Sequence, residues 1–217
     1  MPIEIREIER ARALTAPHLH RTPMLTSRTL GERIGATAYL KAESFQRTGS
    51  FKPRGAVFAV ASLAPERRAK GIVTMSAGNA AAAIAFAAKA VGAKVTVAMP
   101  QSAPQLKVDA TRGYGAKIEF APDMTGLRAL VTKLQDESGA YFLHPYDDDA
   151  MITGHGAVGL EILEDVPDAD LIVVGIGGGG LVSGVAVAAA AKRKGIRIVG
   201  VEPEGAPTMR RALDAGK

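Results

Sequence analysis

Four consecutive glycines, Gly177, Gly178, Gly179 and Gly180, lie between a β-branched segment and an alanine-rich segment that opens at Leu181. Backbone without side chains can approach a phosphate closely, and the first N–H groups of a helix add donors and a favourable dipole. The alternative is a tight strand-to-helix turn, for which one or two glycines would suffice. No Gly-Lys-Ser/Thr follows the run, and its glycine spacing is loose for a dinucleotide site. We therefore expect a phosphate site of another kind.

A lysine stands at the predicted start of a helix in the segment Ser50-Phe-Lys-Pro-Arg-Gly55, because Pro53 suits a first helical turn. The helix dipole disfavours positive charge there, which should shift the amine of Lys52 toward its neutral, nucleophilic form. A neutral amine is the form that condenses with an aldehyde to a Schiff base. The segment alone also permits an ordinary solvated lysine.

A third, polar turn consists of Ser76, Ala77, Gly78 and Asn79 and precedes a run of alanines. Its hydroxyl and amide could grip an anionic ligand, although Ser and Asn are also common helix caps, so capping explains the turn equally well. Together the three segments supply a lysine, a phosphate cradle and an anion-binding turn at the ends of strands, where open α/β sheets place ligands. A phosphorylated aldehyde cofactor needs this set.

The segments between these turns predict the elements that position them. β-Branched runs alternate with amphipathic or alanine-rich runs, which indicates an α/β protein with a mostly parallel sheet. The predicted strands cover residues 38–42, 72–75, 94–99, 116–120, 141–144, 171–176 and 197–201. The predicted helices cover residues 3–14, 53–63, 79–91, 105–112, 126–137, 151–163 and 181–194, followed by a helix-like segment at 209–217.

Composition excludes several other classes of protein. The chain has 217 residues, of which 47% are hydrophobic and 23% charged, as in ordinary globular proteins. The absence of cysteine removes disulfides, thiolate nucleophiles and cysteine-bound zinc. The net charge of +5 is scattered and aromatic residues make up only 5%, so we expect no nucleic-acid partner. The chain has no apolar stretch of roughly 20 residues and no signal-peptide pattern, so we expect no membrane contact and a cytoplasmic location.

Four motifs of the chain occur in the same order as in one known family. They are Ser-Phe-Lys-Pro-Arg-Gly-Ala at 50–56, Ser-Ala-Gly-Asn at 76–79, Phe-Leu-His-Pro-Tyr-Asp-Asp at 142–148 and Gly-Gly-Gly-Gly-Leu-Val-Ser-Gly at 177–184. In this order they resemble the threonine dehydratases and serine racemases, which are pyridoxal-phosphate-dependent enzymes of fold type II, the tryptophan synthase β-like fold. The resemblance covers nearly the whole chain, and four ordered motifs are far more specific than one.

The resemblance implies how the cofactor, pyridoxal 5'-phosphate, would be held. Lys52 would bind it as a Schiff base and later act as base on the substrate α-carbon. Phe51 would pack against the pyridine ring, and Asn79 would bind the 3-oxygen of that ring. The main chain of residues 177–180 and Leu181 would hold the phosphate.

The resemblance also implies a substrate and a reaction. The residues of the polar turn would surround the substrate carboxylate; these are Ser76, Ala77, Gly78 and Asn79. Thr48 is a weaker candidate for the same role. The substrate would be a β-hydroxy amino acid, L-threonine or L-serine, which loses its β-hydroxyl and yields 2-oxobutanoate or pyruvate plus ammonia. The expected assembly is a homodimer or a higher homo-oligomer.

In fold, the resemblance implies two open, mostly parallel, three-layer α/β/α domains. Residues 56–147 would form a small mobile domain whose closure excludes water. Residues 1–55 with 148–217 would form a large cofactor-binding domain. Enzymes of this family continue for about another hundred residues, so the C-terminal part of the large domain, with the Ser, Thr or Cys that binds the pyridine nitrogen, would be missing.

Three positions depart from the family pattern. Ala80 stands where many members have histidine, which leaves the preferred β-hydroxy amino acid open. Ala77 stands where the racemases carry a serine as second base, which favours dehydration over racemisation. His155 lies in Gly-His-Gly-Ala rather than Gly-Gln-Gly-Thr, and we expect it to be a structural histidine with its hydrogen bonds satisfied.

A metal is not expected, and three other functions remain open. The cation site of some relatives aligns with Glu202, Ala206 and Thr208, so one carboxylate is lost and Mg²⁺ or Ca²⁺ binding is weakened. A serine/threonine racemase is the nearest alternative to a dehydratase. A β-replacing enzyme such as a cysteine synthase fits less well, because those enzymes have Asn-Thr-Gly where this chain has Asn-Ala-Ala at 79–81. The last alternative is an inactive fragment that only binds the cofactor or another phosphorylated ligand.

Overall fold

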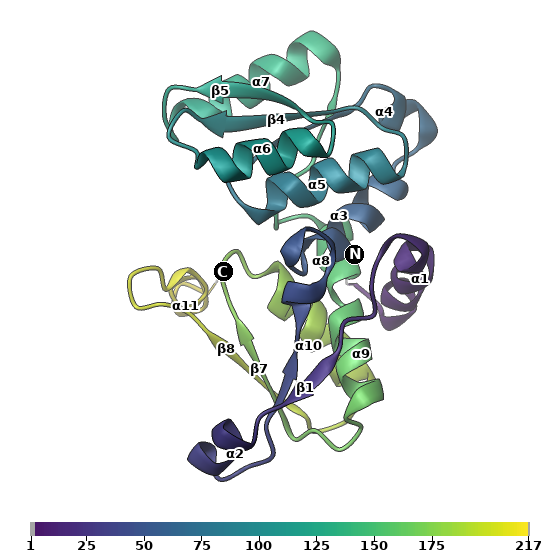
Figure 1. Cartoon of the computed structure of the whole chain (residues 1–217), viewed down its shortest axis with the longest axis vertical. Coiled ribbons are helices and arrows are strands. Elements are labelled where there is room, and N and C mark those ends of the chain that lie inside the picture. The colour runs from purple at the N-terminus through teal and green to yellow at the C-terminus, as the bar shows by residue number, and fades with distance from the viewer. Residues whose placement is uncertain (1–2, 217) are drawn as a thin grey trace.

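The computed structural model describes residues 3–216 and places a four-stranded sheet at one end of the molecule (Figure 1). The strand order is β5-β4-β3-β6, and every pairing is parallel. The strands are β3 (Ile72–Met75), β4 (Val95–Pro100), β5 (Lys117–Ala121) and β6 (Tyr141–Phe142). The predicted α/β class with a mostly parallel sheet is confirmed.

Helices cover both faces of this sheet, because successive strand residues point to opposite sides. One face is packed by α7 (Gly126–Ser138) and the other by α5 (Asn79–Ala90), with α6 (Gln105–Gly113) beside α5 (Figure 1). Val73 belongs to the apolar cluster on the α7 side, and its neighbour Ile72 belongs to the cluster on the α5 side. This part of the chain therefore has three α/β/α layers.

A second group of helices lies next to α5 and positions the polar segments. The group consists of α1 (Ile5–Thr15), α3 (Lys52–Ala61), α8 (Asp149–His155), α9 (Ala157–Asp165) and α10 (Gly180–Lys192). α3 packs on α5 and α8, and α8 packs in turn on α10. Small residues permit these approaches, since a Cβ added to Gly55 would lie 2.4 Å from the Met151 carbonyl oxygen. The single helix predicted at 151–163 is divided at Gly156 into α8 and α9.

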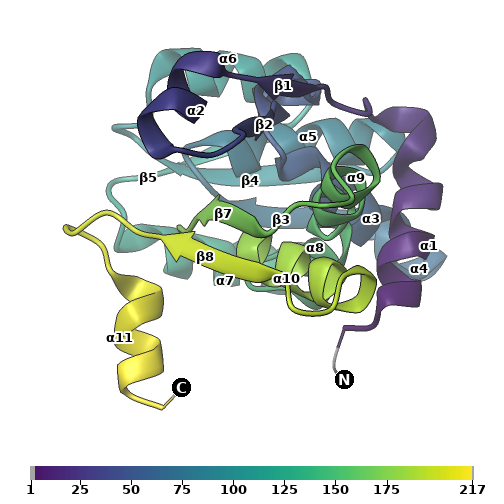
Figure 2. The ribbon, with the colours of Figure 1, turned by 90° about the horizontal axis from the view of Figure 1, so that it is seen from below.

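Two ribbons and three short α-helices complete the described fold, together with the 3-10 helices η1 (Ala16–His18), η2 (Glu43–Phe45) and η3 (Arg47–Gly49). The ribbon strands are β1 (Met24–Thr26) with β2 (Tyr39–Lys41), which pair antiparallel, and β7 (Leu171–Gly175) with β8 (Arg197–Val201), which pair parallel. The short helices are α2 (Arg28–Ile34), α4 (Pro65–Ala69) and α11 (Thr208–Asp214). α11 projects from the body of the molecule (Figure 2). On β7, Val174 is buried against α9 and α10, whereas Val173 is exposed on the opposite face. The strand β1 and the helices α2 and α4 are not among the predicted elements.

The proposed domain boundaries fall at different kinds of position. The boundary after residue 55 lies inside α3, whereas the boundary after residue 147 lies just before α8. The division into a small and a large domain stays a prediction. Within residues 3–216, no helix has the length and apolar character that a membrane crossing requires.

Candidate active site

Lys52 opens α3 with its amine among a carbonyl group and two aromatic rings. Its Nζ donates a hydrogen bond to the Pro145 carbonyl oxygen at 2.9 Å. The same nitrogen lies 5.2 Å from the ring centroid of Phe51 and 6.0 Å from that of Tyr146. Burial lowers the pKa of Lys52 from 10.5 to about 8. The sequence predicts this direction, although from the helix dipole rather than from burial.

The glycine run follows β7 and ends at Gly180, the first residue of α10, and Tyr146 packs against it. A Cβ added to Gly178 would lie 2.2 Å from Cδ2 of Tyr146, and one added to Gly180 would lie 2.8 Å from the Tyr146 carbonyl oxygen. Gly179 has a φ of +84°, a left-handed conformation that favours glycine. Because Tyr146 contacts this turn and also stands 6.0 Å from Nζ of Lys52, the structure brings the amine and the glycine run to one aromatic ring.

The start of α10 presents main-chain donors. Its N-cap residue is Gly179, which has no side chain to occupy the first N–H groups of the helix. Gly180 and the half-buried Leu181 are its first two residues. Gly177 is exposed, and its carbonyl oxygen accepts a hydrogen bond from Thr208 at 3.3 Å. The turn can therefore receive an anion through its backbone.

The polar turn follows β3 and opens α5 in the same manner. The N-cap residue is Gly78, and Oγ of Ser76 accepts a hydrogen bond from the Gly78 N–H at 3.1 Å. The capping interpretation of Ser76 and Asn79 is therefore wrong, and the first N–H groups of α5 are left uncapped by its glycine. Asn79 is exposed, and its Oδ1 accepts a hydrogen bond from Lys107 at 2.7 Å. Ala77 is half-buried.

The loop before α3 carries two buried hydroxyls, those of Thr48 and Ser50. Thr48 belongs to the short 3-10 helix η3 (Arg47–Gly49), which packs on α5, and its φ is +63°. Among residues 3–216, neither its Oγ1 nor Oγ of Ser50 has a hydrogen-bond partner. A left-handed non-glycine residue costs of order 1–3 kcal/mol, and such strain clusters at binding sites. Thr48 is thus a firmer candidate than its sequence alone indicates.

His155 ends α8 and is fully buried between α3 and the glycine turn. Its ring lies 4.9 Å from that of Phe51 in edge geometry, and a Cβ added to Gly180 would lie 3.5 Å from Nδ1. Burial, and then the charge of Lys52, lowers the pKa of His155 to about 3, so the ring is neutral. In the described part of the chain neither ring nitrogen has a partner in regular hydrogen-bond geometry, but hydrogen bonding to the main chain at Gly180 and Lys52 partly offsets the lowering of the pKa. The expectation of satisfied hydrogen bonds therefore stays a prediction.

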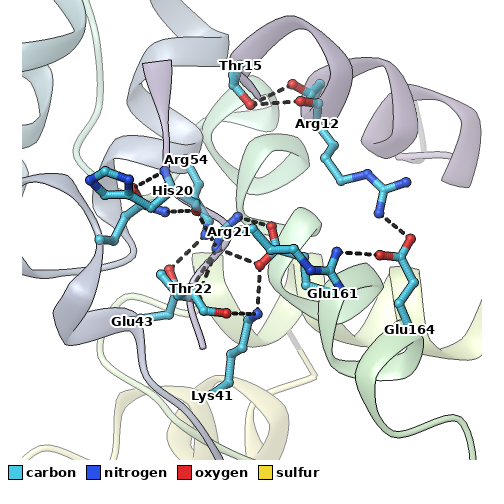
Figure 3. A network of polar contacts seen from close by, with 12 residues as sticks. Arg12, Thr15, His20, Arg21, Thr22, Lys41, Glu43, Arg54, Glu161 and Glu164 are labelled. Carbon is cyan, nitrogen blue, oxygen red and sulfur yellow. Dashed lines mark hydrogen bonds and ion pairs between the residues drawn. The ribbon is translucent and has the colours of Figure 1, made fainter. Parts of the chain in front are cut away.

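A buried network of charges anchors the start of α3 (Figure 3). The guanidinium of Arg54 binds Glu43 at 2.8 and 2.9 Å and Glu161 at 2.7 and 2.9 Å. Lys41 binds the same Glu161 carboxylate at 2.7 Å. Burial alone would lower the pKa of Arg54, but the hydrogen bonds to both carboxylates raise it above its ordinary value. The sequence motifs include Arg54 but do not predict this network.

The residues that align with a cation site serve the start of α11. The carboxylate of Glu202 accepts hydrogen bonds from the N–H groups of Met209 at 2.8 Å and Arg210 at 3.0 Å, and from Oγ1 of Thr208 at 3.1 Å. These bonds, that of Met209 first, lower the pKa of Glu202. Ala206 lies in the loop before α11. Residues 3–216 contain no group of three or more His, Cys, Asp or Glu that could hold a metal ion.

The residues present fit pyridoxal phosphate. The amine of Lys52, with its lowered pKa, would bind the aldehyde of the cofactor, and the N–H groups at the start of α10 would bind its phosphate. The turn is open at Gly177, where an added Cβ would meet nothing within 4 Å, whereas at Gly178 the ring of Tyr146 already occupies the space. The side-chain oxygen of Asn79 is occupied by Lys107, so only its amide N–H groups remain to bind the ring 3-oxygen.

Comparisons with known proteins point to the same cofactor. A family model described as "Pyridoxal-phosphate dependent enzyme" matches residues 15–217. The serine racemase of Arabidopsis thaliana is 42% identical over 215 residues, which cover 99% of this chain and 65% of that protein. The L-threonine ammonia-lyase of Thermotoga maritima is 39% identical over 216 residues, which cover 99% of this chain and 54% of that protein. The structure of maize serine racemase matches with a TM-score of 0.96 at 40% identity, over 100% of this chain and 66% of that chain.

The chain thus spans about two thirds or less of the length of these proteins. The similarity nevertheless extends over nearly all of its own residues, including all three polar turns. The chain belongs to the pyridoxal-phosphate-dependent enzymes of fold type II, in the family of the threonine ammonia-lyases and serine racemases, and its cofactor is pyridoxal 5'-phosphate.

Proposed function

We propose that the protein is an ammonia-lyase that removes the β-hydroxyl of L-threonine, L-serine or both. The products are 2-oxobutanoate or pyruvate, together with ammonia. The observation that carries the proposal is the position of the Lys52 amine, whose pKa is lowered to about 8. This amine lies 6.0 Å from the ring of Tyr146, and the same ring contacts the glycine turn. An amine of this kind is suited to bind an aldehyde and to take up a proton near neutral pH.

The residues of the site divide the work in this proposal. The bound cofactor supplies an electron sink for the substrate α-carbon. Lys52 holds the cofactor and, once released from it, takes the α-proton. The main chain from Gly177 to Leu181 holds the phosphate, and Phe51 packs on the ring. The turn from Ser76 to Asn79 holds the substrate carboxylate, with Thr48 beside it.

We extend the proposal to motion, assembly and location. Residues 56–147, which include the four-stranded sheet, move as a small domain against residues 1–55 and 148–217 and close over the substrate. Closure excludes water from the reacting groups. The assembly is a homodimer or a higher homo-oligomer, and the location is cytoplasmic.

A serine/threonine racemase is the second candidate, because a serine racemase and a threonine ammonia-lyase are similarly close to this chain. Racemisation needs a second proton donor on the face of the α-carbon opposite the lysine. Ala77, at the turn that would supply it, has no such proton. This absence at position 77 favours elimination. A protein that binds the cofactor without turnover is the third candidate.

The test begins with the purified chain and pyridoxal phosphate. Borohydride reduction should fix the cofactor's mass on the peptide that contains Lys52, and the Lys52→Ala variant should lose this label. Lys133→Ala, which changes an exposed lysine of α7, should keep it. Protein that has bound the cofactor but has not been treated with borohydride is then incubated with L-threonine or L-serine. The products measured are the keto acid, ammonia and the D-enantiomer of the substrate.

Each outcome separates two candidates. Keto acid without D-amino acid supports the lyase, whereas D-amino acid without keto acid supports the racemase. A label on Lys52 with neither product supports the binding protein. Absence of a label on Lys52 would overturn the proposal altogether.

A further inference from the structure

We propose that Lys107 is a positioning residue whose ammonium fixes the orientation of the Asn79 side-chain amide. That orientation would leave the amide N–H groups free to bind the 3-oxygen of the cofactor ring. The inference rests on the proposed function, in which Asn79 binds the ring 3-oxygen. It concerns a side chain to which none of the sequence motifs assigns a role.

The contact joins two helices. Nζ of Lys107 donates to Oδ1 of Asn79 at 2.7 Å, across 28 positions of sequence. Asn79 is the first residue of α5, and Lys107 lies in α6, which packs beside α5 on the same face of the sheet. Lys107 is half-buried, Asn79 is exposed, and the hydrogen bond between them lies at the protein surface.

The chemistry of the two groups allows only one polarity. An ammonium has three donors and no acceptor, so the atom of Asn79 that it approaches must be the carbonyl oxygen. The NH2 group of the amide must then point the other way. Without such a partner, the amide can exchange its donor and acceptor ends by turning about its last bond. The positive charge of the ammonium next to Oδ1 also polarises the amide and strengthens its donors.

Neighbouring acids do not compete for this ammonium. Within residues 3–216, none of the ion pairs that lysines form includes Lys107. The acid on its own helix, Asp109, accepts a hydrogen bond from Nε2 of Gln105 at 2.8 Å. An ion pair between a surface lysine and a single exposed carboxylate adds little stability. Lys107 instead donates its hydrogen bond to the amide oxygen of Asn79. The ring 3-oxygen, which needs a donor when it is anionic, would receive that donor from Asn79.

Three variants test the inference by cofactor titration of the purified chain. Lys107→Met removes the donor but keeps a long side chain, Lys107→Arg keeps donors, and Lys89→Met makes the same charge change at an exposed position of α5. We expect Lys107→Met to weaken pyridoxal phosphate binding about 3- to 10-fold, the size of one well-placed hydrogen bond. We also expect it to change the absorbance spectrum of the bound cofactor, which reports the hydrogen bonding of the 3-oxygen. Lys107→Arg should restore most of both properties, and Lys89→Met should match the wild type.

A double-mutant cycle separates orientation from charge. In the Asn79→Ala background, Lys107→Met should have no further effect, because no amide remains to orient. An undiminished effect in that background would overturn the inference, and so would a Lys107→Met variant with unchanged affinity and spectrum. Circular dichroism checks that each variant is folded. A wild-type chain that binds no cofactor would instead overturn the proposed function, and the inference with it.

Discussion

The first turn of α3 carries two cations that the fold treats in opposite ways. Arg54 is 2% exposed and meets the carboxylates of Glu43 and Glu161. Lys52, on the same turn, meets the Pro145 carbonyl and two aromatic rings. Both groups pay the desolvation penalty of burial, but only Arg54 has opposite charges to offset it.

The comparison shows that compensation, rather than position on the helix, decides what each cation can do. The carboxylates raise the pKa of Arg54 against the effect of burial. Burial alone acts on Lys52 and lowers its pKa to about 8. The guanidinium is therefore a fixed charge that anchors α3, while the amine can be neutral and reactive. The anchored charge holds the start of the helix on which the reactive amine lies.

Removing the compensation of Arg54 should have the largest effect. Glu161→Ala leaves the guanidinium with Glu43 and takes from Lys41 a partner at 2.7 Å. Breaking a buried ion pair costs about 3–5 kcal/mol, because the remaining charge is left uncompensated. We expect the free energy of unfolding in urea at pH 7 to fall by this amount.

The matched control removes an exposed glutamate. Glu7→Ala deletes an ion pair with Arg10 whose side chains are 47% and 58% exposed, and such pairs contribute less than about 1 kcal/mol. Equal losses in the two variants would mean that the buried network stabilises the protein no more than a surface pair does.

Giving Lys52 a carboxylate should make it resemble Arg54. Tyr146 is the side chain to change, since its ring lies 6.0 Å from Nζ. In Tyr146→Glu we expect the pKa of Lys52 to rise from about 8 toward 10.5, because a nearby negative charge favours the ammonium. Below pH 8, each unit by which the pKa rises reduces the fraction of neutral amine about tenfold. The rate at which the protein captures pyridoxal phosphate can be followed by absorbance from pH 6.5 to 10. Below pH 8 this rate should fall in proportion to the neutral fraction, and the midpoint of its pH profile should move to higher pH.

The control for this change is Tyr146→Gln, which removes the same ring from Gly178 without adding a charge. Its capture rate reports the loss of packing, and its pH profile should keep a midpoint near that of the wild type. Coincident profiles for the Glu and Gln variants would refute the electrostatic explanation of the Lys52 pKa.

The framework of the fold could be predicted because its signals are local. The runs at β3 and β8 are rich in β-branched residues, and the observed bounds, Ile72–Met75 and Arg197–Val201, agree with the predicted ones. The strand β1 could not be predicted in this way. It has three residues and none of them is buried, so it leaves no alternation of buried and exposed side chains to detect.

The candidate site could be predicted as segments but not as a set of contacts. Motifs identify Lys52, the glycine run and the polar turn, because each is a short pattern. The bond between Arg54 and Glu161 spans 107 positions, and that between Lys107 and Asn79 spans 28. No local pattern encodes such pairings. The burial of His155 likewise arises from helices that meet only in the folded chain.

The smallest expected effect is the loss of folding stability that comes from burying the Lys52 ammonium without an opposite charge nearby. Its folded pKa, about 8, lies below its ordinary value of 10.5. Below pH 8 the amine is charged in both states, and the folded state carries the full desolvation cost. Between pH 8 and 10.5 the unfolded chain binds more protons, so stability rises with pH through this window. Because the amine is partly exposed, solvent screening reduces the cost to about 1–2 kcal/mol.

Lys52→Met should therefore stabilise the cofactor-free protein at pH 7 by about 1–2 kcal/mol, even though it removes the reactive amine. Urea unfolding of the variant and the wild type should show this difference shrinking as the pH rises from 8 to 10.5. Lys133→Met, at an exposed position, should show little difference at any pH. A Lys52→Met variant that is less stable than the wild type at pH 7 would mean that the amine is compensated after all, and the contrast with Arg54 would no longer hold.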